Sequence, residues 1–203
     1  RSMGTESGAY RDLNLNYIQI NRKKYTAADA FNRFCYNNKA LDNSMGHFSL
    51  GNLFSLTIAY LGTYLHRRGM TIDYVNSFSD EKEILAEKLK KNNIRAVAIP
   101  TTLYVSPLPI VEIVSFVRKY NDTAKIIIGG PFIATQFRAI EDEMLVDYLF
   151  KNLNADFYIN SSQGEETLAK VVQAIKHNTG YSNINNISYK ENGKYVTNPT
   201  SIE

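Results

Sequence analysis

Cysteine is almost absent from this sequence of 203 residues, in which Cys35 is the single thiol. One cysteine cannot form a disulfide within the chain, and by itself it cannot build a cysteine-rich metal or iron–sulfur site. This composition favours a reducing, cytoplasmic setting. Because Cys35 stands beside Phe31, Phe34 and Tyr36, we interpret it as a small core residue; no neighbouring base that would make it a nucleophile can be inferred.

Long apolar runs, targeting signals and a strong net charge are also missing. No window approaches the ~20 apolar residues of a membrane span, and no signal peptide is recognisable. The formal net charge is +3 and the lysines are dispersed, which does not argue for nucleic acid. We therefore expect neither a membrane nor a nucleic acid as partner. Residues 1–10 (RSMGTESGAY) are polar, and RSM is typical of a leader added in cloning, so we treat them as an unstructured start.

What the sequence does contain is a regular alternation of strand and helix patterns. Short apolar or alternating runs predict strands over 13–20, 71–78, 95–101, 124–130 and 155–160. Helical spacing predicts helices over 52–68, 80–93, 107–120, part of 135–153, and 164–178. A hairpin is predicted over 185–198, with Asn192-Gly193 as its two-residue turn.

Alternating elements with short connections require right-handed crossovers and a parallel sheet. The segments 95–101 and 124–130 are near-continuous apolar runs, as expected of strands covered on both faces. We therefore predict an α/β fold of the flavodoxin-like (Rossmann-like) class, a doubly wound five-stranded parallel sheet in the order 2-1-3-4-5 with a C-terminal β-hairpin. The α/β domain is expected to span 11–180, with 21–51 as an unusually long loop or helical insertion.

Three predicted loops share the edge of the sheet at which a ligand should bind. In an open parallel sheet, ligands lie beyond the carboxyl ends of the strands. The loops there are rich in small and hydroxyl-bearing residues: PTTLYVSP (100–107), GGPFIATQ (129–136) and NSSQGEE (160–166). Such residues let the backbone approach a ligand, and their amides and hydroxyls hold phosphate. Any one loop could merely turn the chain, but three at one edge favour a ligand site.

Several functional motifs of this fold class are missing. The sequence has no G-x-G-x-x-G loop after its first strand and no G-x-S-x-G nucleophile elbow. The third strand ends in Ile99-Pro100-Thr101 rather than in an acceptor aspartate, and the loop after the first strand opens with NRKKY rather than with a Thr/Ser/Gly phosphate loop. A dinucleotide enzyme, a hydrolase, a phospho-receiver and a flavodoxin are therefore disfavoured.

The remaining pattern resembles the cobalamin (vitamin B12)-binding domain found ahead of the catalytic barrel of B12-dependent radical SAM enzymes. The resemblance covers roughly residues 50–180 and rests on LTIAYLGTYLHRRGMTIDYVNSF (56–78), RAVAIPTTLYVS (95–106), AKIIIGGPFIA (124–134) and ADFYINSSQGEETL (155–168). The trailing NISYKENGKYVTNP (186–199) is similar to the ribbon that leads into the barrel. Residues 181–203 would then be a hairpin and linker towards a catalytic domain outside this chain.

This resemblance implies a cofactor site at the carboxyl edge of the sheet. The implied cofactor-binding residues are Thr101, Thr102, Gly129, Gly130, Pro131, Ser161, Ser162, Gly164 and Glu165. The threonines would lie near the corrin or the nucleotide loop, the Gly-Gly-Pro segment would flank the nucleotide tail, and the last four would lie at its far side. Amides, hydroxyls and a slot between small residues would suit the phosphate, ribose and benzimidazole of that tail.

Two features depart from the family pattern. The D-x-H-x-x-G motif is absent; its histidine ligates cobalt in mutases and methionine synthase, and radical SAM members often lack it. His47, in the long loop, is the candidate cobalt ligand, with an ordinary loop histidine as the alternative. Pro100-Thr101-Thr102 stands where the family more often has a serine.

The resemblance implies a chain that binds and orients cobalamin for a parent enzyme performing methyl transfer or a radical rearrangement. The parent would also use S-adenosylmethionine and a 4Fe-4S cluster, which needs three cysteines and must lie outside this chain. The partner would be the C-terminal radical SAM barrel of the same protein, and the substrate a peptide or small molecule. Two alternatives stay open: a degenerate, cofactor-free module that docks a peptide substrate or partner protein through 21–51, and a nucleotide-type small-molecule binder.

Overall fold

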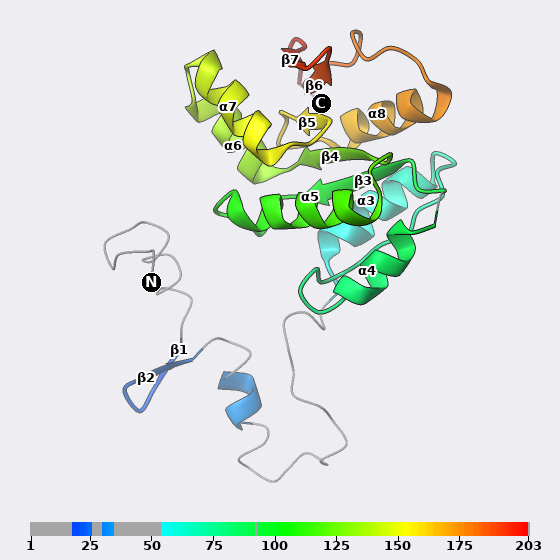
Figure 1. The fold of residues 1–203 in the computed structure, drawn as a ribbon. Helices are drawn as coiled ribbons and strands as arrows, with labels where there is room; N and C mark the ends of the chain where they lie inside the picture. The colour runs from blue at the N-terminus through cyan, green and yellow to red at the C-terminus, as the bar shows by residue number, and fades with distance from the viewer. Residues whose placement is uncertain (1–17, 26–29, 35–53, 92, 203) are drawn as a thin grey trace. The chain divides into compact units, whose positions relative to one another are not determined.

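The computed structural model describes residues 18–25, 30–34, 54–91 and 93–202 (Figure 1). The chain divides into two compact units, Arg1–Phe54 and Ser55–Glu203. The strands of the second unit are β3 (Ala96–Pro100), β4 (Lys125–Gly129), β5 (Phe157–Ile159), β6 (Ile187–Glu191) and β7 (Lys194–Thr197). Its helices are α3 (Leu56–His66), α4 (Lys82–Leu89), α5 (Leu108–Tyr120), α6 (Pro131–Ala139), α7 (Glu143–Leu153) and α8 (Glu165–His177).

The second unit is built on one sheet of five strands, in the order β3-β4-β5-β6-β7. The first three strands run parallel, and β6 and β7 are antiparallel additions next to β5. The predicted α/β, Rossmann-like class is therefore confirmed. Asn192 and Gly193 have φ angles of 49° and 79°, as a two-residue hairpin turn with positive φ at both positions requires, so the hairpin prediction is confirmed too.

The predicted strand order 2-1-3-4-5 is wrong, because the first two predicted strands are not in this sheet. The described end of the segment 13–20 forms β1 (Ile18–Ile20), which pairs with β2 (Lys23–Tyr25) in a separate antiparallel sheet. The segment 71–78 forms no strand. The parallel part of the main sheet consequently has three strands instead of five.

Local side-chain contacts explain why 71–78 is not a strand. The Glu81 carboxylate accepts hydrogen bonds from the backbone amides of Asn76 and Ser77, at 2.6 and 2.8 Å. These amides are thereby withdrawn from pairing with a neighbouring strand. Side-chain bonding to nearby backbone groups competes with sheet ladders in this way.

The predicted helical region within 135–153 is two helices, α6 and α7. The first ends at Ala139 and the second begins at Glu143. Between them Asp142 is in an extended conformation, and its side chain accepts a hydrogen bond from the Met144 amide at 2.8 Å. This aspartate is an N-cap, which starts a new helix rather than continuing the old one.

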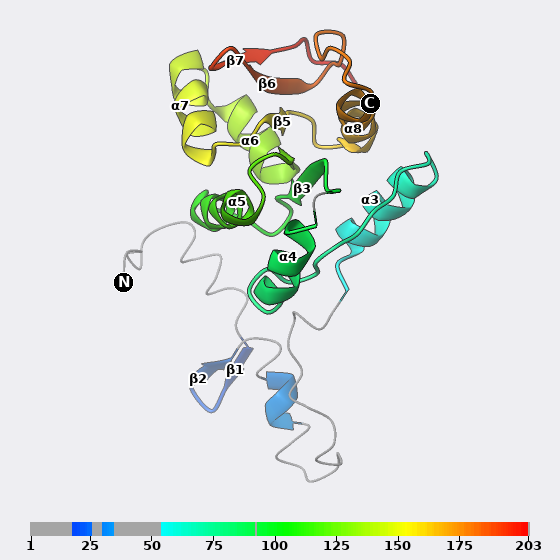
Figure 2. The same cartoon turned by 45° about the vertical axis from the view of Figure 1, so that its right-hand side comes forward.

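Different helices cover the two faces of the sheet (Figure 2). Ile126 and Ile128 of β4 pack in a cluster with α4, α5, α6 and α7, whereas Ile127 packs in a cluster with α3 and α8. Each of the three side chains is at most 1% exposed, which confirms the burial on both faces that the apolar run predicts. Burial of one such side chain stabilises the fold by about 1.5–3 kcal/mol.

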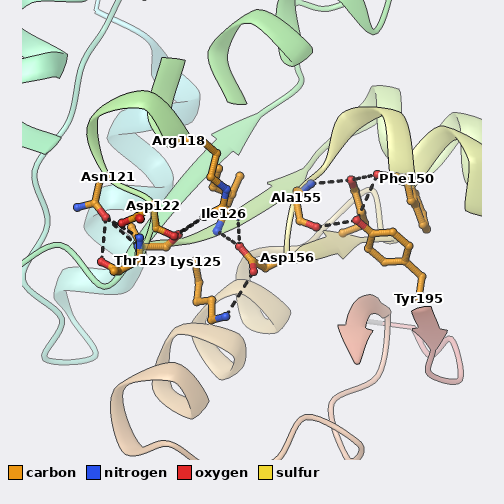
Figure 3. A network of polar contacts seen from close by, with 12 residues as sticks. Arg118, Asn121, Asp122, Thr123, Lys125, Ile126, Phe150, Ala155, Asp156 and Tyr195 are labelled. Atoms are coloured by element: carbon orange, nitrogen blue, oxygen red, sulfur yellow. Dashed lines mark hydrogen bonds and ion pairs between the residues drawn. The ribbon is translucent and has the colours of Figure 1, made fainter. Parts of the chain in front are cut away.

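A polar network joins the amino ends of the central strands (Figure 3). Asp156, directly before β5, accepts hydrogen bonds from the side chains of Arg118 and Lys125 and from the Ile126 amide. The Tyr195 hydroxyl of β7 donates to two backbone carbonyls at the end of α7 and just after it. These contacts align the strands whose opposite ends carry the candidate site.

Candidate functional site

The carboxyl ends of the three parallel strands lie side by side. Pro100 at the end of β3 is paired with Gly129 at the end of β4. A Cβ added to Gly129 would lie 3.1 Å from the Cβ of Ile159 at the end of β5. The three small-residue loops therefore start at one edge, and each leads into a helix: α5, α6 or α8.

The two threonines after β3 have different surroundings. Thr101 is fully buried, and both its amide and its hydroxyl donate to the Gly129 carbonyl, at 2.8 and 2.9 Å. Thr102 is exposed, and its Oγ1 lies 3.4 Å from Thr57 Oγ1 in α3. Thr101 thus ties the ends of β3 and β4 together, and the Thr102 hydroxyl is the one that can meet a ligand.

Gly130 has a backbone conformation, φ 107° and ψ −173°, that residues with a Cβ rarely adopt. A Cβ there would also lie 3.0 Å from both the amide nitrogen and the Oγ1 of Thr101. Glycine therefore lets the loop after β4 lie against the loop after β3. Pro131 follows as the first residue of α6, a position at which a missing N–H has no cost.

The loop after β5 is folded on itself. Ser161 Oγ donates to the Gln163 carbonyl at 2.8 Å and accepts from the Gln163 amide at 3.2 Å. Ser162 is exposed. A Cβ on Gly164 would come within 2.6 Å of Ile159 Cγ2, so glycine allows α8 to begin directly against β5.

Glu165 opens α8 and accepts a hydrogen bond from the Tyr60 hydroxyl of α3, at 3.0 Å. This hydrogen bond, together with the negative charge of Glu165, raises the pKa of Tyr60 above its ordinary value. Sequence reasoning missed both Tyr60 and Thr57. Their contacts join positions 105 and 45 residues apart, for which the sequence carries no local signal.

Helices α5, α6 and α8 all begin at this edge without a side-chain cap. Their N-cap residues, Pro107, Gly130 and Gly164, form no side-chain hydrogen bond to the first-turn amides. In α3 and α7, by contrast, Ser55 and Asp142 provide such a cap, whereas α4, with Glu81 as its N-cap, also has none. Uncapped first-turn amides and the helix dipole together attract anions. The first turns of α5 and α6 hold no acidic residue, whereas α8 begins with Glu165 and Glu166. The starts of α5 and α6 are therefore the ones suited to a phosphate group.

Asn160, directly after β5, is another polar residue that sequence reasoning did not name. It is 6% exposed, and its side-chain nitrogen donates to Ser188 Oγ at 2.9 Å. Within the described residues its Oδ1 is buried without a hydrogen-bond partner. Buried acceptors normally have a partner, so this oxygen can take a donor from a ligand or a bound water. The sequence feature that could have pointed to this residue is the asparagine at the end of the apolar run ADFYIN.

Large apolar side chains are exposed beside the same loops. Leu103 and Val105, after β3, are 87% and 73% exposed, and Leu108, at the start of α5, is 76% exposed. Single exposed apolar residues are normal, but a cluster of them indicates an interaction surface. This surface suits a large, partly apolar ligand.

His47 and Cys35 lie outside the described residues, so the candidate cobalt ligand stays a prediction. In the described part of the chain, no group of three or more His, Cys, Asp or Glu side chains is placed to hold a metal ion. Over the same residues, no helix combines the length and the apolarity that crossing a membrane requires.

Comparisons with known proteins give a match in structure and none in sequence. No protein family and no curated protein matches the sequence. Two solved structures of the radical S-adenosylmethionine methyltransferase TsrM from Kitasatospora setae are similar. The structure with tryptophan substrate and a SAM analogue bound has a TM-score of 0.59 and 17% identity over 74% of this chain. The structure with cobalamin and a [4Fe-4S] cluster bound has a TM-score of 0.60 and 16% identity over 76%.

The match covers a minor part of the TsrM chains, 28% and 27% of their lengths. At this level of identity the likeness shows the fold alone. It agrees with the α/β, Rossmann-like class seen in the second unit.

Proposed function

We propose that this chain is the cobalamin-binding domain of a B12-dependent radical SAM enzyme, in which it binds and orients cobalamin. The observation that carries the proposal is the carboxyl edge of the sheet, where three uncapped helices start beside exposed hydroxyls and apolar side chains. The similarity in fold to TsrM, which has been solved with cobalamin bound, supports the same assignment.

The groups at this edge fit the parts of cobalamin. The first-turn amides of α6, a helix with no acidic residue in that turn, suit the phosphate of the nucleotide tail. The hydroxyls of Thr102 and Ser162 and the carboxylate of Glu165 suit the hydroxyls of the ribose, and the exposed Leu103 and Val105 suit apolar parts of the corrin. A Cβ on Gly130 would already crowd Thr101, so we assign the glycines to bringing the loops together rather than to forming a slot for the tail.

The proposal extends to the parent protein. Bound cobalamin would supply methyl transfer or another radical rearrangement, in combination with S-adenosylmethionine. The 4Fe-4S cluster would belong to a C-terminal radical SAM barrel, because this chain has one cysteine and the cluster needs three. The substrate would be a peptide or small molecule, and the site of action the cytoplasm.

Retention of cobalamin by the purified chain tests the proposal. The 203-residue chain is mixed with hydroxocobalamin and desalted, and its visible spectrum is recorded. We expect corrin bands at a near-stoichiometric ratio to protein. A folded but colourless protein, with native circular dichroism, contradicts the proposal and leaves a cofactor-free docking module as the better account.

The uncapped end of α8 gives a sharper prediction. Ser162→Asp removes the hydroxyl assigned to the ribose and adds a third carboxylate beside Glu165 and Glu166, and it should weaken hydroxocobalamin binding about tenfold, or about 1.4 kcal/mol. The matched control is Ser182→Asp, at an exposed serine in the loop after the other end of α8, which should bind as the wild type does. Absorbance titrations measure both affinities, and equal values for the two variants would place the nucleotide tail away from the start of α8.

A further inference from the structure

Two residues of the proposed cofactor site, Thr102 and Glu165, are engaged by the same helix, α3. Thr57 Oγ1 lies 3.4 Å from Thr102 Oγ1, and the Tyr60 hydroxyl donates to Glu165 at 3.0 Å. Thr102 and Glu165 follow different strands, β3 and β5. The first turns of α3 therefore bridge two of the three loops at the carboxyl edge.

The half of α3 that forms this bridge is weakly held. None of the residues 56–60 is buried, and Tyr60 is exposed. The other half carries the buried Leu65, which packs in the apolar cluster with α8. Exposed hydrogen bonds contribute little to stability, and segments with few buried apolar contacts open locally at low cost. The exposed part of α3 can therefore move while its carboxyl half stays packed.

A third contact attaches the start of α3 to the segment that follows the helix. The Ser55 amide, at the N-cap of α3, donates to Asn76 Oδ1 at 2.8 Å. Ser55 and Leu65 thus anchor the two ends of a short stretch whose middle is attached through Thr57 and Tyr60. Movement of this stretch changes the two contacts that reach the site.

We propose that residues 56–60 form a latch beside the cofactor site, held closed by the hydrogen bond between Tyr60 and Glu165. The ligand, cobalamin, rests on the proposed function. In the closed state Tyr60 is hydrogen-bonded to Glu165, and Thr57 lies against Thr102. In the open state both contacts are broken, and Glu165 and Thr102 can bind the ligand. A protein whose binding-competent state is a fraction of the population binds with an affinity lowered by that fraction. The latch therefore slows and weakens cofactor entry.

Tyr60→Phe tests the latch because it removes the hydroxyl and keeps the ring. The open fraction should rise, and the association rate constant and affinity for hydroxocobalamin should both increase roughly 2- to 10-fold, the range expected for loss of one hydrogen bond. Stopped-flow absorbance measures the rate, and titration measures the affinity. Association that is unchanged or slower in this variant overturns the latch.

Tyr64→Phe is the matched control on the same helix. Tyr64 lies one turn beyond Tyr60, and its ring lies under the Arg68 guanidinium, 3.4 Å from ring centre to Cζ, a contact that phenylalanine retains. Among the described residues its hydroxyl forms no hydrogen bond. This variant should bind hydroxocobalamin at the wild-type rate. An equal acceleration in both variants would attribute the effect to general loosening of α3 and would contradict a role for the Tyr60 hydroxyl.

A measurement without cofactor separates the latch from the proposed function. Hydrogen–deuterium exchange of the amides in 56–60 should be roughly 2- to 10-fold faster in Tyr60→Phe than in the wild type, with exchange in α8 unchanged. Equal exchange in the two proteins contradicts the latch, whatever the result with cobalamin. Failure of the wild type to retain hydroxocobalamin contradicts the proposed function instead.

Discussion

Replacing Gly130 by alanine is expected to lower the free energy of unfolding by about 3 kcal/mol and the melting temperature by about 10 °C. The backbone at Gly130, with φ 107° and ψ −173°, is in a region essentially closed to residues that carry a Cβ. The added methyl group would also lie 3.0 Å from the amide nitrogen and Oγ1 of Thr101, which both bond to the Gly129 carbonyl. Strain and crowding therefore act together where the loops after β3 and β4 meet. Urea unfolding followed by circular dichroism measures the loss.

Gly62 is the matched control for this substitution. It lies inside α3, and a Cβ added there meets nothing within 4 Å. Alanine at this position should stabilise the chain by about 0.5–1 kcal/mol, because it favours a helix more than glycine does. A loss below about 1 kcal/mol at Gly130 would show that the loop relaxes around the methyl group and does not require glycine.

Replacing Asp156 by alanine is expected to lower the free energy of unfolding by about 3 kcal/mol. Its carboxylate accepts hydrogen bonds from the Arg118 and Lys125 side chains and from the Ile126 amide (Figure 3). The side chains of Asp156 and Arg118 are 19% and 26% exposed. Removal of the acid leaves a largely covered guanidinium without its carboxylate, although it still donates to the Ala124 carbonyl, and leaves the Ile126 amide without its acceptor. Both losses are costly.

A surface ion pair controls for the loss of charge alone. Asp147 and Lys151 form a pair four residues apart on α7, with side chains 37% and 58% exposed. Asp147→Ala should change the free energy of unfolding by no more than about 0.5 kcal/mol. Comparable losses for the two variants would show that Asp156 acts as an ordinary surface charge.

Because Asp156 lies at the amino edge, its variant should bind hydroxocobalamin normally under conditions in which it is folded.

Elements whose signal lies within one short segment could be predicted from the sequence. The apolar run 124–130 predicted β4 with burial on both faces, and Asn192-Gly193 predicted the turn between β6 and β7. The shared edge of the three small-residue loops also followed, because parallel strands bring their carboxyl ends together. Whether that edge holds cobalamin stays a prediction.

Pairing between distant segments could not be predicted in the same way. The alternating patterns over 13–20 and 71–78 are compatible with strands. Alternation indicates that a strand would have one apolar face, but it does not identify the strand with which the segment pairs. The described part of the first segment pairs with Lys23–Tyr25, and Glu81 takes two amides of the second. Backbone pairing decided the structure of the first segment, and a side chain beyond its end decided that of the second.

The sequence by itself determined that small and hydroxyl-bearing residues follow each parallel strand, because those residues are adjacent in the chain. Only the tertiary structure decided what they do. Thr101 turns inward to the Gly129 carbonyl, whereas Thr102 stays exposed. Tyr60 reaches Glu165 across 105 residues of sequence. The spacing of apolar residues is a property of the local sequence. The hydrogen-bond partner of a hydroxyl, and the space available for a Cβ, depend instead on which distant segments folding places next to that residue.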